Sequence, residues 1–244
     1  MPQMYSLTAT PLFLTGIYLI IIVNNNISSF SYENKTIKIR GKYRIGPHDK
    51  DVLSIIHGSL LGDGHAEKRL TGIGTRITFY QEHSHLKYLH YLHNVLSEKG
   101  YCNDKIPTIK QRLGVGGKVR KVGKFATWTY TSFNWIHNEW YKNGKKCVPI
   151  DIDKYLTPLA LAIWIMDDGS KVSKGLKFST NSFTFEECTH LSDVLYKNFK
   201  LKSSVQSAGA KDQYIVYIWK ESMKDLVSIV FPYIIPEMKY KIAA

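Results

Sequence analysis

Two aspartates stand in similar surroundings far apart in the chain. Asp63 and Asp168 are each followed by glycine, and each ends an apolar run that is typical of a short helix. The carboxyl end of a helix disfavours an anion by about 0.3–1 kcal/mol unless a cation is bound there. Two carboxylates held close together would suit Mg²⁺, which prefers oxygen ligands, and such sites cleave phosphodiester bonds. A lone Asp-Gly is usually a turn, but its repetition after 105 residues weakens that interpretation.

The residues around each aspartate predict where its helix begins and ends. Asp51 can cap the first helix, whereas Thr157 and Pro158 supply an N-cap and a first-turn proline for the second. We expect Gly64 and Gly169 to adopt the left-handed conformation that closes many helices. Both aspartates then fall in the last turn of their helices.

The two helices must pack side by side if their aspartates are to meet. Gly58 and Gly62, four residues apart, leave one face of the first helix almost bare, so that another helix can approach closely. In the second helix we expect Ala162 as the small residue among bulkier neighbours, so the packing should be asymmetric.

After residue 50 the chain repeats one order of elements, α-β-β-α-β-β-α, which predicts an α+β fold of two pseudo-symmetric halves, 51–150 and 151–244. The second long helix opens with a capping box at Thr184–Glu187. After the motif helices, the elements are predicted at Arg76–Gln81, Ser84–Lys99, Ile106–Leu113, Phe125–Thr131 and Phe133–Tyr141, and again at Leu176–Asn181, Thr184–Lys200, Ser203–Ser207, Gln213–Trp219 and Ser222–Val230.

The charge balance points to an anionic partner. Lys and Arg number 33 against 20 Asp and Glu, which gives a net charge of +13, and nucleic acid is the usual ligand of such a chain. Residues 101–150 hold ten Lys or Arg and two acids. The alternating basic residues around Lys118–Lys124 predict an extended ribbon that could follow phosphates. A merely basic soluble protein and a solvated hairpin are the alternatives.

The first fifty residues form an apolar and then basic appendage to the repeat. Leu12–Val23 is almost wholly apolar, but a membrane span needs about 20 such residues, so we do not expect residues 4–23 to contact a membrane. The three cysteines are isolated and odd in number, which indicates neither a disulfide framework nor a cysteine zinc site. A reducing compartment fits this pattern better.

The two aspartate segments resemble the two copies of the LAGLIDADG motif, which names a family of homing endonucleases. Three flanking stretches resemble the mitochondrial intron endonucleases of yeasts in particular, and the resemblance covers residues 51–242. The motif copies are Ile56–Gly64 and Leu161–Gly169, and the flanking stretches are Tyr155–Pro158, Asn181–Glu187 and Pro236–Lys241.

The resemblance implies a metal site between the two motifs. The eighth motif residue, Asp63 or Asp168, would bind Mg²⁺, with Mn²⁺ as a substitute. The residue before it, Gly62 or Asp167, would offer its backbone carbonyl to the metal.

The resemblance also implies catalytic residues away from the motifs. Lys146 and Lys241, one near the end of each half, would polarise the attacking water. Gln81 and Asn181 would order the water network, although asparagine is shorter than the glutamine that is usual there.

The family fold implies that both antiparallel sheets form a saddle over duplex DNA, with the motif helices at the centre. Strand side chains would then read bases while Lys and Arg hold phosphates. Two unlike halves imply a monomer that acts on a long, non-palindromic site, and the resemblance places it in the mitochondrion. The candidate DNA-binding residues are Arg69, Arg76, Lys110, Arg112, Lys118, Arg120, Lys171, Lys174 and Lys177.

Other functions remain open from the sequence. An RNA maturase would assist the splicing of its own group I intron, with or without cleavage, and a DNA-binding regulator would lack cleavage. Both acids are intact, which favours cleavage. The appendage, residues 1–50, would be a linker or a remnant of a host exon. We expect the crowded histidines His83, His85, His90 and His93 to lie on the surface or to face DNA rather than to bind zinc.

Overall fold

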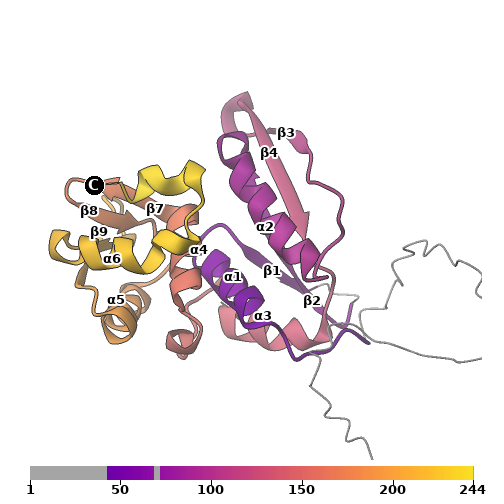
Figure 1. Cartoon of the computed structure of the whole chain (residues 1–244), viewed down its shortest axis with the longest axis horizontal. Helices are drawn as coiled ribbons and strands as arrows, with labels where there is room; N and C mark the ends of the chain where they lie inside the picture. Colours follow the sequence, from indigo (N-terminus) through magenta and orange to yellow (C-terminus); the bar gives the residue numbers. More distant parts are fainter. Residues whose placement is uncertain (1–42, 69–71, 244) are drawn as a thin grey trace, which may run out of the picture. The chain divides into compact units, whose positions relative to one another are not determined.

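The computed structural model describes residues 43–68 and 72–243, and the element order of these residues repeats as expected (Figure 1). The first half contains α1 (Lys50–Leu61), β1 (His65–Lys68), β2 (Thr75–Glu82), α2 (Leu86–Glu98), β3 (Ile109–Leu113), β4 (Val119–Ala126) and α3 (Asn134–Trp140). The second contains α4 (Pro158–Asp168), β7 (Gly169–Val172), β8 (Gly175–Phe178), α5 (Phe185–Phe199), β9 (Ser203–Ser207), β10 (Tyr214–Ile218) and α6 (Met223–Val230). A short hairpin of β5 (Tyr141–Lys142) and β6 (Lys145–Lys146) ends the first half, and the 3₁₀ helix η8 (Pro236–Lys241) ends the second.

The two halves share one sheet topology. Their strand orders are β1-β2-β4-β3 and β7-β8-β10-β9, and every neighbouring pair is antiparallel. The helices α1 and α4 lie side by side (Figure 1) and belong to one continuous hydrophobic core. The prediction of an α+β fold with antiparallel sheets and central motif helices is confirmed.

Helix starts agree with the sequence in the second half, whereas the start of α1 differs. Thr157 caps α4 by accepting a hydrogen bond from the backbone N–H of Ala160, and Thr184 and Glu187 form the expected capping box of α5. The N-cap of α1 is Asp49, so the prediction for Asp51 is wrong. Asp51 instead lies in the first turn, where a carboxylate also favours the helix.

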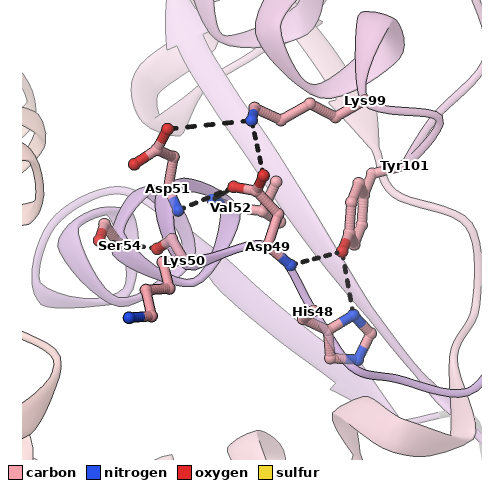
Figure 2. A network of polar contacts seen from close by, with 8 residues as sticks. All are labelled: His48, Asp49, Lys50, Asp51, Val52, Ser54, Lys99 and Tyr101. Carbon is pink, nitrogen blue, oxygen red and sulfur yellow. Dashed lines mark hydrogen bonds and ion pairs between the residues drawn. The ribbon is translucent and has the colours of Figure 1, made fainter. Parts of the chain in front are cut away.

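Residues before the repeat hold the start of α1 in place (Figure 2). The Asp49 side chain accepts hydrogen bonds from two backbone N–H groups of α1 and pairs with Lys99 at 2.7 Å. His48 contacts the Tyr101 and Ser132 hydroxyls, and the Arg44 guanidinium donates to a backbone carbonyl beyond β4. The description of all fifty residues as an appendage is therefore wrong for residues 43–49.

Gly64 and Gly169 allow close packing and do not adopt a left-handed backbone conformation. Gly169 has φ of −70°, and Gly64 is absent from the positive-φ residues of the described chain, so the predicted left-handed caps are wrong. A Cβ atom on Gly64 would lie 2.7 Å from the Ser59 carbonyl oxygen, and one on Gly169 would lie 2.7 Å from that of Ile165. The chain turns back against its own helix at these points, which leaves no room for a side chain.

The fourth strand is displaced from its predicted position. β4 covers Val119–Ala126, so the basic ribbon forms most of the strand, and only the first two residues of the predicted Phe125–Thr131 belong to it. The ladder stops at Thr127, whose hydroxyl accepts the hydrogen bond of the Ile77 backbone N–H. A side chain thus replaces a backbone partner and ends the strand.

One histidine of α1, His57, is buried in the core. The His57 ring stacks on Tyr155 with centroids 4.2 Å apart, and its Nδ1 accepts a hydrogen bond from Trp140 Nε1 at 3.1 Å. Burial lowers the pKa of His57 from 6.5 to about 3, so the ring is neutral in the folded protein near neutral pH.

Membrane contact was not expected from the sequence. None of the described helices is both long and apolar enough to cross a membrane. The apolar residues 4–23 lie outside the described residues.

Truncated chains can distinguish the contribution of residues 43–49 to stability from that of the residues before them. A chain that begins at Lys42 keeps the contacts of Arg44, His48 and Asp49, so we expect it to melt and act like the full chain. A chain that begins at Asp51 loses the α1 cap, which alone contributes about 0.5–2 kcal/mol. We expect a clear fall in its melting temperature, measured by circular dichroism. Equal melting of the two truncated chains would contradict this role of residues 43–49.

The buried His57 makes stability depend on pH. Its pKa is lower in the folded protein, so the unfolded chain binds more protons between about pH 6.5 and 3. Stability should be fully retained above this window and fall through it by up to about 1.4 kcal/mol per pH unit from this group. His57→Asn keeps a hydrogen-bond acceptor for Trp140 and does not titrate.

The denaturant stability of this variant, measured from pH 7.5 to 4, should therefore approach that of the native chain as pH falls. Exposed His83→Asn is the matched control and should track the native chain throughout. If the difference in free energy of unfolding between the native and His57→Asn proteins stayed constant over this pH range, His57 would not change protonation on unfolding.

Candidate active site

Two glycines let the backbones of α1 and α4 touch. A Cβ atom on Gly58 would lie 2.5 Å from the Ala160 carbonyl oxygen, and one on Gly62 would overlap the Asp167 side chain. Larger residues at these positions would push the helices apart. The predicted close approach at Gly58 and Gly62 is confirmed. Sequence reasoning overlooked Ala160, because the contact is made by its backbone.

Three carboxyl groups meet where these helices end. Asp167 and Asp168 are the last residues of α4, as predicted for Asp168, whereas Asp63 lies just beyond the C-cap of α1. The prediction that Asp63 lies within the last turn is wrong because Gly62 has already left the helical conformation, with ψ of −127°. Gln81 of β2 bridges the halves, since its Nε2 donates to Asp63 Oδ2 at 2.9 Å and to Asp167 Oδ1 at 3.0 Å.

Each half supplies one lysine to its own motif. Lys146 of β6 donates to the carbonyl oxygens of Gly62 and Gly64 at 2.9 and 3.0 Å. Lys241 of η8 donates to those of Met166 and Asp167 at 2.6 and 3.0 Å. The carbonyls of Gly62, Met166 and Asp167 lie at helix ends and lack intrahelical donors, so an ammonium group satisfies them well. The structure thus brings both predicted lysines to the predicted acids.

The site crowds three carboxyl groups together, and two of them are largely shielded from water. Burial raises the pKa of Asp168 to about 7 and that of Asp167 well above its usual range, and repulsion from Asp63 adds to both. Burial also lowers the pKa of Lys146 to about 8, against the attraction of the carboxylates. Burial also lowers the pKa of Lys241. Crowded carboxyl groups with raised pKa values are typical of catalytic and cation-binding sites.

Comparison with known proteins shows which family has this arrangement. Residues 53–226 match the LAGLIDADG DNA endonuclease family. The chain belongs to this family. It is 53% identical to the cytochrome b mRNA maturase bI2 of Debaryomyces hansenii, over 80% of this chain and 75% of that protein. It is 52% identical to the Saccharomyces cerevisiae protein of the same name. That match covers 86% of this chain but only about half, 51%, of the length of the relative.

The solved structure of a homing endonuclease is also similar along most of the chain. The homing endonuclease I-WcaI, solved bound to its DNA recognition sequence, superposes with a TM-score of 0.72. The two chains are 28% identical, and the match covers 80% of this chain and 87% of I-WcaI. The family resemblance inferred from the two motifs is therefore confirmed.

The donor set fits a divalent cation. Asp63 is exposed, Asp168 is half-buried, and the carbonyls of Gly62 and Asp167 lie beside them. A hard cation would favour the ionised carboxyl groups against the burial and mutual repulsion that raise their pKa values. No cluster of three or more His, Cys, Asp or Glu side chains within residues 43–68 and 72–243 is arranged to hold a metal. Two carboxylates supplemented by carbonyl oxygens form a sparser site than such a cluster.

The Asp167 side chain is a part of the site that sequence reasoning missed. The family resemblance implies a role only for its backbone carbonyl. Its Oδ2 has no hydrogen-bond partner of good geometry among the described residues, although the Tyr88 hydroxyl interacts with the same carboxyl group. The signal in the sequence was the contrast between Gly62-Asp63 and Asp167-Asp168 at equivalent motif positions.

Gln81 and Asn181 are not equivalent in the LAGLIDADG halves. Asn181 is exposed beyond the end of β8, and its amide donates to Gln213 rather than to an aspartate. Extending the strand register places Gln81 opposite Gly62 and Thr180 opposite Asp167. Thr180 is fully buried and donates to the Tyr214 carbonyl. The structural counterpart of Gln81 is therefore Thr180, and the site has one amide bridge rather than two.

Most candidate DNA-binding residues lie on strands or the turns beside them. Arg69 lies outside the described residues. Arg76 pairs with Glu67 at 2.7 Å across β1 and β2, so part of its charge is already engaged. The others are on β3 (Lys110, Arg112), before and on β4 (Lys118, Arg120), on β7 (Lys171), in the following turn (Lys174) and on β8 (Lys177).

Of the four crowded histidines, three make hydrogen-bonding contacts within the protein. His93 is buried, and its Nε2 contacts the Asn103 carbonyl, so the expectation of a surface position is wrong for it. His90 contacts the Pro107 carbonyl, and His85 contacts the Tyr240 hydroxyl. His83 is exposed.

Proposed function

We propose that this protein is a sequence-specific endonuclease that cuts both strands of duplex DNA with a divalent cation, Mg²⁺ or Mn²⁺. The observation that carries the proposal is the meeting of Asp63 and Asp168 at the ends of two touching helices, each beside a lysine from its own half. Two sets of groups related by approximate symmetry suit the cutting of two antiparallel strands, and this arrangement supplies them.

The site residues have distinct parts in this reaction. Asp63 and Asp168, with the carbonyls of Gly62 and Asp167, would hold the cation, which supplies Lewis acidity at the scissile phosphate. Gln81 fixes Asp63 relative to the second motif. Lys146, with its pKa near 8, can exchange a proton close to neutral pH.

The DNA-binding proposal rests on the sheets and the net charge of +13. Basic side chains on exposed strands would hold phosphates and read base edges in the major groove. I-WcaI, similar over most of this chain, was solved with its DNA recognition sequence. Two unlike halves support a monomer and a non-palindromic target.

A second function is favoured by the relatives themselves. The proteins that are 52% and 53% identical are both named cytochrome b mRNA maturases. We propose that the chain also assists the splicing of its own group I intron and acts in mitochondria. Splicing of that intron transcript with and without the purified protein tests this role, and equal rates would contradict it.

The two aspartates should be required for cleavage but not for folding. We expect Asp63→Asn and Asp168→Asn to abolish double-strand cleavage in Mg²⁺ while gel-shift affinity for the target stays within about tenfold, because the sheets supply most of the binding. The target is the intron-free form of the gene. Because burial disfavours ionised Asp168, Asp168→Asn should melt no lower than the native chain.

Exposed Asp225→Asn on α6 is the matched control and should cut normally. Full double-strand cleavage by either active-site variant would contradict the assignment of its aspartate.

The two lysines should affect the two strands differently. We expect Lys146→Met and Lys241→Met each to slow cleavage by about 100-fold or more, since a positioned proton-transfer group contributes about that much. The halves differ, so each variant should accumulate nicked duplex cut on a preferred strand. Single-turnover rates for each labelled strand test this, with exposed Lys224→Met as the control. If both variants cleaved DNA at the native rate, these lysines would have no part in catalysis.

A further inference from the structure

The strand register separates the first sheet into two faces. On β3 and β4, Arg112 is paired with Arg120, and Lys110 is paired with Val122, so all four lie on one face. The opposite face carries Gly123, where an added Cβ atom would overlap Leu89 of α2. The arginines therefore point away from the helix that covers the sheet.

The hairpin of β3 and β4 extends as an exposed ribbon. Every residue of β3 is exposed, as are the first three residues of β4. Even Leu113 and Val119, which face each other near its end, are 73% and 55% exposed. A two-stranded ribbon of this kind fits the major groove of DNA.

The arginine pair is unfavourable without an anionic ligand. Like charges directly opposite each other on neighbouring strands destabilise a sheet. Arg120 reaches Glu82 at 3.5 Å, but both side chains are more than half exposed, so this pair contributes little. Among the described residues, Arg112 has no carboxylate within ion-pair distance. The pair makes physical sense when both guanidinium groups meet a polyanion.

The equivalent hairpin of the second half has different chemistry. β9 reads SSVQS and β10 reads YIVYI, so neither strand has a charged side chain. Residues 151–244 contain no arginine at all. On the face away from the core, Gln206 is paired with Ile215 and Ser204 with Tyr217, which is paired in turn with Lys177. Lys171 is paired with buried Leu176 and so lies on the core side of the sheet.

We propose that the two halves recognise DNA by different chemistry, an inference that rests on the proposed endonuclease function. The β3–β4 ribbon binds its half-site through Arg112, Arg120 and Lys110, which read guanine and neutralise phosphates. The β9–β10 hairpin reads its half-site through neutral hydrogen bonds and apolar contacts, with Gln206 suited to adenine and Ile215 to a thymine methyl group. The β3–β4 ribbon therefore contributes more of the salt dependence of binding than the uncharged β9–β10 hairpin does.

Salt dependence gives a direct readout of this division. Each phosphate neutralised by a basic side chain adds about 0.9 to the slope of log affinity against log salt concentration. Base-specific contacts to guanine add discrimination of roughly 1–3 kcal/mol, or about 5- to 150-fold, per contact. Neutral contacts in the second half change discrimination without changing the slope.

The test uses the full chain and a duplex recovered by cleavage from a randomised duplex pool. Arg112→Gln with Arg120→Gln should weaken binding by about 25-fold or more, lower the salt slope by about 1 to 2, and relax base preference in one half-site. Gln206→Ala should relax preference in the other half-site and leave the slope unchanged. The double arginine variant should melt no lower than the native chain, because the like-charge pair is removed.

A matched charge control excludes a general electrostatic effect. Lys220→Gln with Lys224→Gln removes the same charge from exposed residues outside both sheets and should leave slope and base preference as in the native chain. The proposed difference between the halves would be wrong if the two double variants changed the salt slope equally. It would also be wrong if Gln206→Ala relaxed a preference for guanine. Cleavage of no duplex in the pool by the native chain would overturn the endonuclease function as well.

Discussion

The contact between the backbones of α1 and α4 is the constraint on which the rest of the structure depends. Because Gly58 and Gly62 have no side chains, the second helix reaches the first where a Cβ atom would otherwise overlap it. This contact brings Asp63 and Asp168, which are 105 residues apart in the chain, to one end of the helix pair. The sheets, the capping residues and the two lysines are positioned relative to that pair, so the site is a consequence of how closely two helices can pack.

The same contact creates an electrostatic cost that the chain offsets only in part. Three carboxyl groups gather near the negative ends of two helices, and burial raises the pKa values of Asp167 and Asp168. Lys146 and Lys241 bind backbone carbonyls rather than the carboxylates themselves. The lysines therefore cancel the helix-end charge and leave the aspartate oxygens available. A bound cation would stabilise such a site, so the folding energy of the protein would depend on the occupancy of the site.

Patterns that depend on local chemistry could be predicted from the sequence, whereas those that depend on neighbours could not. The presence of the motif helices, the Thr157 cap and the capping box follow from residues close in the chain, and they were predicted correctly. The cap of α1 is Asp49 rather than Asp51, although both are close to the helix start. Gly169 was expected to need a left-handed backbone, but the structure uses it for space against Ile165. The Asp167 side chain was missed because its partner Gln81 lies 86 residues away and on another element. Spacing along a helix shows which residues share a face, but not which distant side chain will meet them.

The departures from symmetry are as informative as the symmetry. A duplicated fold gives each half the same topology, yet the second motif has Asp167 where the first has Gly62, and a clash is avoided only because one of the two is glycine. The amide bridge of Gln81 has no counterpart, since Thr180 occupies the equivalent position and bonds within its own sheet. Two identical halves would place two aspartates or two glycines at this contact, giving either overlap or an empty space. Joining the halves in one chain removes that restriction, so the site can hold three carboxyl groups and one bridge.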